Sequence, residues 1–339
     1  MASKDDWPCR RAELSQLIQA FEYGAYPPAP SSVTGSLSSD GLTLTVTVNY
    51  GSKSITFSPT VALPTGSGPF PVYVGLGAPS MGSEGVTPFD APTITARGIA
   101  YIEYDTYDMA MDAPGKFGKF YTLYGTSVTS GVLMAWGWGV HRIVDALGQI
   151  PTFDATKVAA HGFSRFGKGA LVTGAFDERI ALTMASSSGA GGIGSWRVAD
   201  VQTDSVQTLQ EVLGESPHWF TSALQSFSGK TNNLPFDGHS VAALVAPRPL
   251  LVTEGSTDTW NDPIGCYTAA AAAKILFDYV APADTFGFSS MGFGHAFVET
   301  AAALAFIDRF LLGKSTKTKY FENPGNFTVD PSYIPWTAP

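Results

Sequence analysis

The most constraining feature of the sequence is the stretch over residues 157–170, Lys-Val-Ala-Ala-His-Gly-Phe-Ser-Arg-Phe-Gly-Lys-Gly-Ala. A short apolar run ends at Gly162, Ser164 follows, and a glycine-punctuated segment opens into a helix-forming sequence. This order of strand, tight turn, serine and helix is typical of a nucleophile elbow, which lifts the serine Oγ clear of a sheet. The second glycine, Gly167, stands three residues after the serine instead of two, so the hypothesis needs a histidine and an acid further along the chain.

The composition indicates a protein with a large core and excludes several classes of partner. The 339 residues are 44% apolar and 14% charged, enough for one large domain or two small ones. A net charge of −9 argues against nucleic acid as a partner. The sequence contains no run of about 18 apolar residues, so it predicts no membrane-spanning helix. Aromatic residues, at 12%, fit a rich core and stacking on sugar rings equally well.

The ends and the cysteines of the sequence add two expectations. The N-terminus shows no apolar segment of a signal peptide, so either the protein is cytosolic or such a peptide has been replaced. Cys9 and Cys266 are the two cysteines, and no Cys/His spacing suits zinc, so we expect neither a metal nor a cofactor.

The hydrophobic pattern predicts the fold class. Apolar spacing predicts a short helix over residues 7–22, and alternation predicts an antiparallel hairpin over 41–62. Beyond the hairpin, short buried strands alternate with helices: strands at 70–76, 99–104, 158–161, 250–253 and 285–289, and helices at 130–147, after Ser164 and at 299–312. This alternation predicts an α/β protein, a three-layer αβα sandwich of the α/β-hydrolase type with a mostly parallel central sheet. We expect one domain over 1–339, with the tail 316–339 packed on its surface.

A histidine stands where such a fold carries its general base. His295 follows the strand at 285–289 and precedes the last helix, which gives the chain order serine, acid, histidine. Its imidazole can take the Ser164 proton and return it to the leaving alcohol; the plainer alternative is a loop or helix-capping histidine. We expect ordinary hydrogen-bonding roles for the other histidines, which are His141, His161, His218 and His239.

Two aspartates compete for the role of the acid. The strand at 250–253 runs into Glu-Gly-Ser-Thr-Asp-Thr-Trp-Asn-Asp-Pro, which contains Asp258 and Asp262. Either aspartate suits a loop cap as well. We favour Asp258 because it lies closer to the strand end and therefore to the predicted base.

Several segments resemble one family. Gly-Phe-Ser-Arg-Phe-Gly-Lys-Gly-Ala is followed by Asp-Glu-Arg-Ile-Ala-Leu-Thr and by Ser-Gly-Ala-Gly-Gly-x-x-x-Trp-Arg. With Ala-Trp-Gly-Trp-Gly-Val, Leu-Pro-Phe-Asp-Gly-His-Ser and Ala-Pro-Arg-Pro-Leu, these segments resemble the glucuronoyl esterases, carbohydrate esterase family 15, over about residues 7–312. The resemblance implies a secreted serine esterase, without a metal, that cleaves the ester between 4-O-methyl-glucuronic acid side chains of xylan and lignin alcohols. We expect a monomer.

The resemblance also implies roles for individual residues. Ser164 would be the nucleophile and His295 the base, and Arg165, next to the nucleophile, would help to form the oxyanion hole, where a guanidinium adds full charge. The backbone near Gly77 is the expected source of a further oxyanion donor. The residues that the resemblance assigns to the uronate are Lys168, Gln207, Glu215 and Trp260; for the first three the alternative is a solvated helix face.

The chain departs from the family in two respects. Many members place the triad acid, a glutamate, at the position that is Ser187 here, so the chain is expected to rely on Asp258 alone. Linked cysteines of fungal members are replaced by Phe163 and Ala296, so we expect the chain's own two cysteines to be mostly unpaired.

Two alternative functions stay open. One is an acetyl-xylan or other small-ester hydrolase of the same fold, although an acetyl group needs no set of contacts such as Gln207, Glu215 and Trp260 offer. The other is a catalytically impaired sugar-binding homologue, which the replacement of the family's acid by Ser187 suggests.

Overall fold

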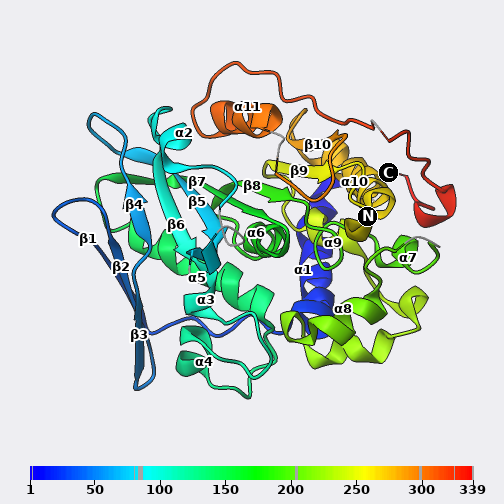
Figure 1. Ribbon diagram of the computed structural model, residues 1–339, viewed down its shortest axis with the longest axis horizontal. Coiled ribbons are helices and arrows are strands. Elements are labelled where there is room, and N and C mark those ends of the chain that lie inside the picture. Colours follow the sequence, from blue (N-terminus) through cyan, green and yellow to red (C-terminus); the bar gives the residue numbers. More distant parts are fainter. Residues whose placement is uncertain are drawn as a thin grey trace.

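The computed structural model describes residues 1, 3–79, 81–82, 87–202, 205–297, 300–323 and 325–337. Within these ranges a central sheet has the strand order β10-β9-β8-β7-β5-β6-β4 (Figure 1). Neighbouring strands pair in parallel except for β4, a short edge strand antiparallel to β6. The strands are β4 (Thr60–Ala62), β5 (Phe70–Gly77), β6 (Ala100–Asp105), β7 (Phe153–Phe163), β8 (Ile180–Ser186), β9 (Leu250–Gly255) and β10 (Phe286–Met291).

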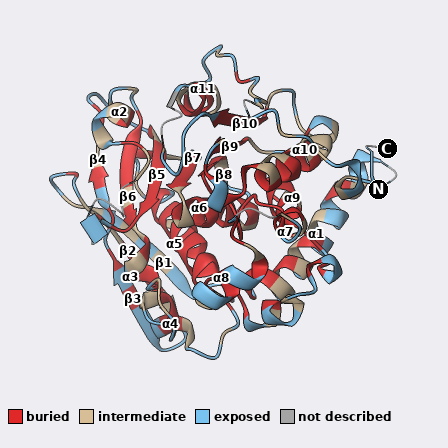
Figure 2. Ribbon diagram, turned by 45° about the vertical axis from the view of Figure 1, so that its right-hand side comes forward, coloured by how far each residue is buried: buried red, intermediate tan, exposed pale blue. Residues whose placement is uncertain are grey.

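Both faces of the central sheet are buried, and alternate residues divide between them. On β5, Val74 belongs to one apolar cluster and Tyr73 to another, and on β7 Ala160 and Ala159 divide in the same way. The first cluster includes side chains of α5 (Val132–Leu147) and α6 (Arg165–Phe176), and the second includes those of α11 (Thr300–Phe310). Figure 2 shows the buried strands between these helices. The predicted three-layer α/β sandwich is confirmed.

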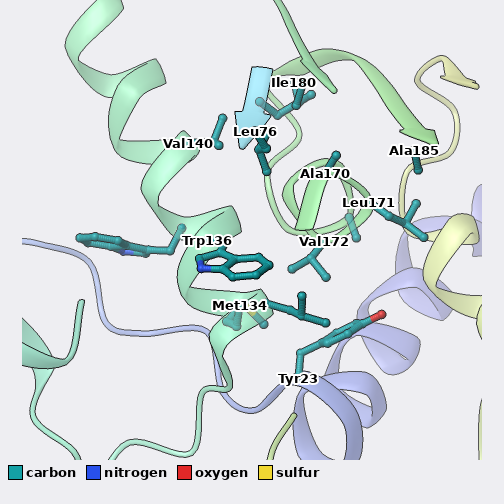
Figure 3. Close-up of a cluster of buried hydrophobic side chains, with 14 of the residues drawn as sticks. Tyr23, Leu76, Met134, Trp136, Val140, Ala170, Leu171, Val172, Ile180 and Ala185 are labelled. Atoms are coloured by element: carbon teal, nitrogen blue, oxygen red, sulfur yellow. The ribbon is translucent and has the colours of Figure 1, made fainter. Parts of the chain in front are cut away.

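The largest apolar cluster includes side chains that lie between α5, α6 and the sheet. Figure 3 shows Trp136 and Met134 of α5 with Val172 of α6 and Leu76 of β5 in one buried cluster. The indole N–H of Trp136 donates to Ala110 O at 2.8 Å, so this large side chain leaves no unpaired polar atom in the core.

The N-terminal hairpin is confirmed and has a third strand. β2 (Leu44–Tyr50) and β3 (Lys53–Phe57) pair in antiparallel fashion, as the alternation predicts, and β1 (Ser32–Leu37) pairs with β2 on the other side. A Cβ at Gly35 would lie 2.5 Å from the Cβ of Ala146, so this glycine lets β1 approach α5.

The remaining helices are short except for α1 and α10, and the sequence pattern did not predict α10. The predicted helix over 7–22 is confirmed as α1 (Trp7–Ile18) continued by a π-helical turn, whereas β8 and α10 (Pro263–Val280) were missed. The predicted start of the last helix at residue 299 lies outside the described residues. The other helices are α2 (Ala91–Thr95), α3 (Thr106–Met109), α4 (Lys119–Tyr124), α7 (Trp196–Ala199), α8 (Leu209–Glu215) and α9 (Gly238–Ala243).

The segment after α11 returns to the sheet. The backbone N–H of Phe288 in β10 donates to Tyr320 O at 3.0 Å, and the N–H of Glu322 donates to Phe288 O at 3.0 Å. Beyond this bridge the chain runs past α10 (Figure 1), so that the two ends lie near each other. Among the described helices none is long and apolar enough to cross a membrane.

Candidate active site

Ser164 occupies the sharp turn between β7 and α6. Its backbone has φ 58° and ψ −126°, a strained conformation for a residue with a side chain, of the kind that proteins keep at functional sites. Its N–H donates to Ser186 O at 2.9 Å, and its C=O accepts from Lys168 N at 3.1 Å. Serine at a helix N-cap commonly accepts an N–H of the first turn, but the side chain of Ser164 makes no such bond. Its Oγ is therefore free for another partner.

The unusual glycine spacing has a packing reason. A Cβ at Gly162 would lie 2.1 Å from Phe166 O, and a Cβ at Gly167 would lie 2.5 Å from Ser186 O. Both contacts are with backbone, so neither position accepts a larger residue without movement. The second glycine, three residues after Ser164, is thus required where α6 passes against the end of β8.

The predicted serine, histidine and acid form one hydrogen-bonded chain. His295 Nε2 lies 2.9 Å from Ser164 Oγ, and His295 Nδ1 lies 2.6 Å from Asp258 Oδ2. Asp258 follows β9 and His295 follows β10, and these neighbouring parallel strands deliver both loops to the same edge of the sheet as Ser164. The Asp258 side chain is only 4% exposed, whereas that of His295 is 42% exposed. The order of contacts is that of a Ser-His-Asp triad.

The other acids near this edge have different partners. Asp262 caps α10, where its carboxylate accepts from Gly265 N at 2.8 Å, so it takes the loop-capping role that both aspartates had in the sequence. Glu254 is buried and accepts from Ser188 N at 3.0 Å and from Asn261 Nδ2 at 2.8 Å. Burial raises the pKa of Glu254 to about 8. Asp258 is thus the described carboxylate that contacts the histidine.

The positions at which the chain departs from the resembled family lie around the triad. Ser187 is buried at the end of β8, where its N–H donates to Thr253 O at 2.7 Å. The ring of Phe163 lies 4.8 Å from the imidazole of His295. Phe163 therefore contacts the histidine through its ring, at a position where the resembled fungal members carry one of two linked cysteines. Both cysteines are unpaired, as predicted.

Arg165, the first residue of α6, points into a polar cluster that the sequence did not reveal. Its Nη1 lies 2.6 Å from Asp112 Oδ2, and its guanidinium lies over the Trp219 ring at 5.9 Å. Asp112 also accepts from His218 Nε2 at 2.8 Å. These groups come from segments far apart in the sequence with no shared motif, so no spacing rule was able to find Asp112.

Gln207, Glu215 and Trp260 lie together. Gln207 Nε2 donates to Glu215 Oε2 at 3.2 Å, and Gln207 N donates to Trp260 O at 3.0 Å. Trp260 is 41% exposed and stands two residues after Asp258, on the short turn that Asp258 begins. Three of the four residues that the resemblance assigns to the uronate are therefore brought to one place beside Asp258.

Lys168 does not lie on a solvated helix face, which was the alternative for it in the sequence. Its side chain is buried, Nζ donates to Ser188 O at 2.7 Å, and the ammonium lies 5.4 Å from the centre of the Trp219 ring. Burial lowers the pKa of Lys168 to about 8. One of its three N–H donors is thus engaged by the protein itself.

The candidate triad lies at the carboxyl edge of the sheet, where the side chain of His295 is 42% exposed. A cavity of about 900 Å³ between α1, α9, α10 and the C-terminal segment is lined by none of the triad residues. Among the described residues no group of three or more His, Cys, Asp or Glu side chains is arranged to hold a metal ion. The second oxyanion donor expected near Gly77 is not tested, because the loop after β5 includes residues 80 and 83–86, outside the described ranges.

Comparison with known proteins places these features in context. A family model described as glucuronyl esterase, fungi, matches residues 46–281. The 4-O-methyl-glucuronoyl methylesterase of Hypocrea jecorina (strain QM6a) is 39% identical over 355 residues, which span 100% of this chain and 73% of that protein.

Two solved structures extend the likeness to three dimensions. A carbohydrate esterase family 15 glucuronoyl esterase from Caldicellulosiruptor kristjansonii has a TM-score of 0.87 at 36% identity, covering 99% of this chain and 93% of that one. The second is a serine-to-alanine mutant of the Sporotrichum thermophile glucuronoyl esterase in complex with methyl 4-O-methyl-beta-D-glucopyranuronate. It has a TM-score of 0.88 at 33% identity and covers 99% of this chain and 90% of that one.

Proposed function

Because the chain belongs to the glucuronoyl esterases of carbohydrate esterase family 15 and hydrolyses 4-O-methyl-glucuronoyl esters, we propose that Ser164, His295 and Asp258 are the triad that performs this reaction. The observation that carries the proposal is the continuous hydrogen-bonded chain at the elbow, with its 2.9 Å and 2.6 Å contacts. The strained backbone of Ser164 and its uncapped Oγ support the same assignment.

In the first half of the reaction, Ser164 Oγ attacks the uronoyl carbonyl carbon while His295 Nε2 takes the hydroxyl proton. Asp258 holds Nδ1–H, which fixes the tautomer and stabilises the imidazolium. The tetrahedral oxyanion forms beside the free N–H groups of the first turn of α6 and the Arg165 guanidinium. The bond to the alcohol then breaks, and His295 gives its proton to the departing oxygen.

In the second half, water hydrolyses the glucuronoyl-enzyme. His295 takes a proton from the water as it attacks the acyl carbon, the bond to Ser164 Oγ breaks, and Oγ regains a proton. Glucuronic acid leaves. No metal is needed, because the carbonyl is polarised by charge and N–H donors of the protein.

Sugar recognition is assigned to the cluster beside the acid. Gln207, Glu215 and Trp260 offer an amide, a carboxylate and an exposed indole within one contact network, which suits the vicinal hydroxyls and apolar face of a uronate. Lys168 has N–H donors left over from its bond to Ser188 O and supplies a charged donor to the same ring. An acetyl ester would use none of these groups.

The open edge favours a substrate attached to a polymer. The side chains of His295 and Trp260 are 42% and 41% exposed, so a xylan chain carrying the uronate and a bulky lignin alcohol both have room. All triad residues come from one chain, so we take the monomer as the active unit. Since such a substrate lies in plant cell walls, we propose that the protein acts outside the cell.

The test is hydrolysis of methyl glucuronate ester by the wild type and Ser164→Ala. The substitution is expected to lower kcat by a factor on the order of 10⁶ while leaving the melting temperature nearly unchanged. Ser187→Ala is the matched control, because it removes a buried hydroxyl from the neighbouring strand end, and it is expected to stay active. A few per cent of residual activity in a clean Ser164→Ala preparation would rule out the nucleophile assignment.

A further inference from the structure

The carboxylate of Asp112 is surrounded by donors. It accepts from Arg165 Nη1 at 2.6 Å, from Tyr107 OH at 3.0 Å, from His218 Nε2 at 2.8 Å and from Trp219 Nε1 at 2.5 Å. The Asp112 side chain is 4% exposed. The donors belong to α3, to α6 and to the short 3₁₀ turn Pro217–Trp219, so three separate segments converge on one carboxyl group.

This environment keeps Asp112 ionised. Burial by itself raises the pKa of the carboxyl, but the hydrogen bonds from His218, Trp219 and Arg165 outweigh it and hold the pKa well below its ordinary range. A buried carboxylate is tolerated only where it is paired and hydrogen-bonded, and here both oxygens are. Asp112 is therefore a fixed negative charge at neutral pH.

Arg165 is the member of this cluster that faces solvent. Its side chain is 42% exposed, and a free arginine side chain carries about 2 kcal/mol of rotamer entropy. Asp112 holds the guanidinium at one end, and the Trp219 ring lies under its face at 5.9 Å. The guanidinium belongs to the residue that directly follows Ser164, and Asp112 and Trp219 together restrict the positions that it can take.

We propose that Asp112 is a positioning residue that holds the Arg165 guanidinium where the oxyanion of the tetrahedral intermediate develops. The inference rests on the proposed function, in which Arg165 stabilises that oxyanion. Preorganised donors stabilise a transition state because they need no rearrangement when the charge appears. Tyr107, His218 and Trp219 act one step further away, by fixing the carboxylate itself.

Geometry and charge make opposite predictions here. If position matters most, the loss of Asp112 lets Arg165 move and kcat falls. If charge matters most, removing a carboxylate from beside the guanidinium leaves a stronger cation, and kcat rises. The proposal requires the first result.

The experiment is a double-mutant cycle on methyl glucuronate ester with Asp112→Asn, Arg165→Gln and the double variant. Asp112→Asn is expected to lower kcat about 10- to 100-fold with KM changed less than about threefold, as for a misplaced transition-state donor. In the Arg165→Gln background, the same change is expected to cost less than about threefold, because its effect passes through the arginine. Tyr107→Phe, which deletes one donor hydroxyl, is expected to show a smaller loss of kcat with the same dependence on Arg165.

The matched control is Asp177→Asn. Asp177 pairs with Arg179 at 2.6 Å, and the exposures of the two side chains, 8% and 47%, are close to those of the pair at the site. Asp177→Asn is expected to lower the melting temperature without lowering kcat. All of these variants are assayed on the same substrate, methyl glucuronate ester.

The outcomes separate the inference from the function on which it rests. An unchanged or raised kcat in Asp112→Asn overturns the positioning role, as does an equal loss with and without Arg165. If Asp112→Asn does not fold, Tyr107→Phe decides by the same criterion. If Arg165→Gln is silent while Ser164→Ala is inactive, the triad stands and the positioning role falls; if Ser164→Ala is active, the proposed function itself fails.

Discussion

The nucleophile and the base of the proposed triad are held in different ways. Ser164 stands between β7 and α6, where backbone hydrogen bonds and two glycine contacts enclose it. His295 stands in residues 291–296, all of which are exposed, and it is held by Asp258 on one side and the Phe163 ring on the other. The serine is fixed by the interior of the fold, whereas the imidazole is fixed by side-chain contacts on an exposed loop that backbone bonds tie to Ser256 and Thr257.

The difference shows where catalytic geometry is vulnerable. On the nucleophile side a strained backbone is maintained by close packing, so harm comes from an added atom. On the base side residues 291–296 are exposed and are tied to the segment after β9 by backbone bonds from Ser256 and Thr257, so the position of the imidazole depends on its own side-chain contacts, and harm comes from the loss of one hydrogen bond. Each half of the triad is therefore predicted to fail through a different kind of substitution.

The largest expected effect is on the base side. Asp258→Asn removes the charge that holds the His295 tautomer and is expected to lower kcat by about 10⁴ with KM little changed. Steady-state kinetics on methyl glucuronate ester measures the loss. A near-wild-type Asp258→Asn enzyme would mean that another group orients the histidine.

The next effect tests packing on the nucleophile side against the loop. Gly167→Ala places a Cβ 2.5 Å from Ser186 O, whereas a Cβ at Gly292 meets nothing within 4 Å. Gly167→Ala is expected to lower kcat by a factor on the order of 10² and to cost roughly 1–3 kcal/mol of stability. Gly292→Ala is expected to be nearly silent in both assays. Equal effects from the two glycines would refute the contrast between interior and loop.

A smaller effect concerns the choice of substrate. It tests Trp260, in the turn after Asp258, and Glu215, at the end of α8. Trp260→Ala and Glu215→Ala each remove a predicted uronate contact but no reacting group, at a cost of roughly 1–3 kcal/mol in transition-state binding. The loss of kcat/KM is expected on the glucuronate ester and not on p-nitrophenyl acetate. Matching losses on both esters would show that these residues only support the fold.

The effect expected to be smallest on turnover is a pH dependence of stability on the base side. Burial raises the pKa of Glu254 from 4.5 to about 8, so between these values the folded state binds more protons than the unfolded state. The free energy of unfolding is therefore expected to fall as pH rises from about 5 to about 8, and Glu254→Gln is expected to flatten this slope. Urea titrations at several pH values measure it; an unchanged slope in the variant would assign the dependence to other groups.

The layers of the fold, which the structure confirms, and the elbow on which the proposed triad is built both follow from local signals in the sequence. Strands such as β5 and β9 are short, continuous apolar runs, and the elbow is a contiguous motif. β8 was missed because Ile-Ala-Leu-Thr-Met-Ala-Ser is rich in alanine, which has little preference for strands. α10 was missed because its alanine run shows no polar face to mark a helical period.

The parts of the site that the sequence did not predict depend on contacts between distant segments. Asp112 meets Arg165 across 53 positions and Trp219 across 107, and, unlike Ser164 and His295, these residues belong to no motif with a known order along the chain. Glu254 reads from the sequence as the polar end of a strand, and only the fold shows that it ties Ser188 to Asn261. Side-chain hydrogen bonds between distant segments depend on tertiary packing, which cannot be predicted from the pattern of one sequence.

The bridge between β10 and the segment at 320–322 has a consequence for the end of the protein. An edge strand with open N–H and C=O groups is a template for pairing with another molecule, and here the chain's own C-terminal segment occupies both groups of Phe288. The same strand leads directly into the loop of His295. The C-terminal segment thus covers the edge of the sheet, and a chain cut before Tyr320 would leave both backbone groups of Phe288 open to pairing with another molecule, beside its own active site.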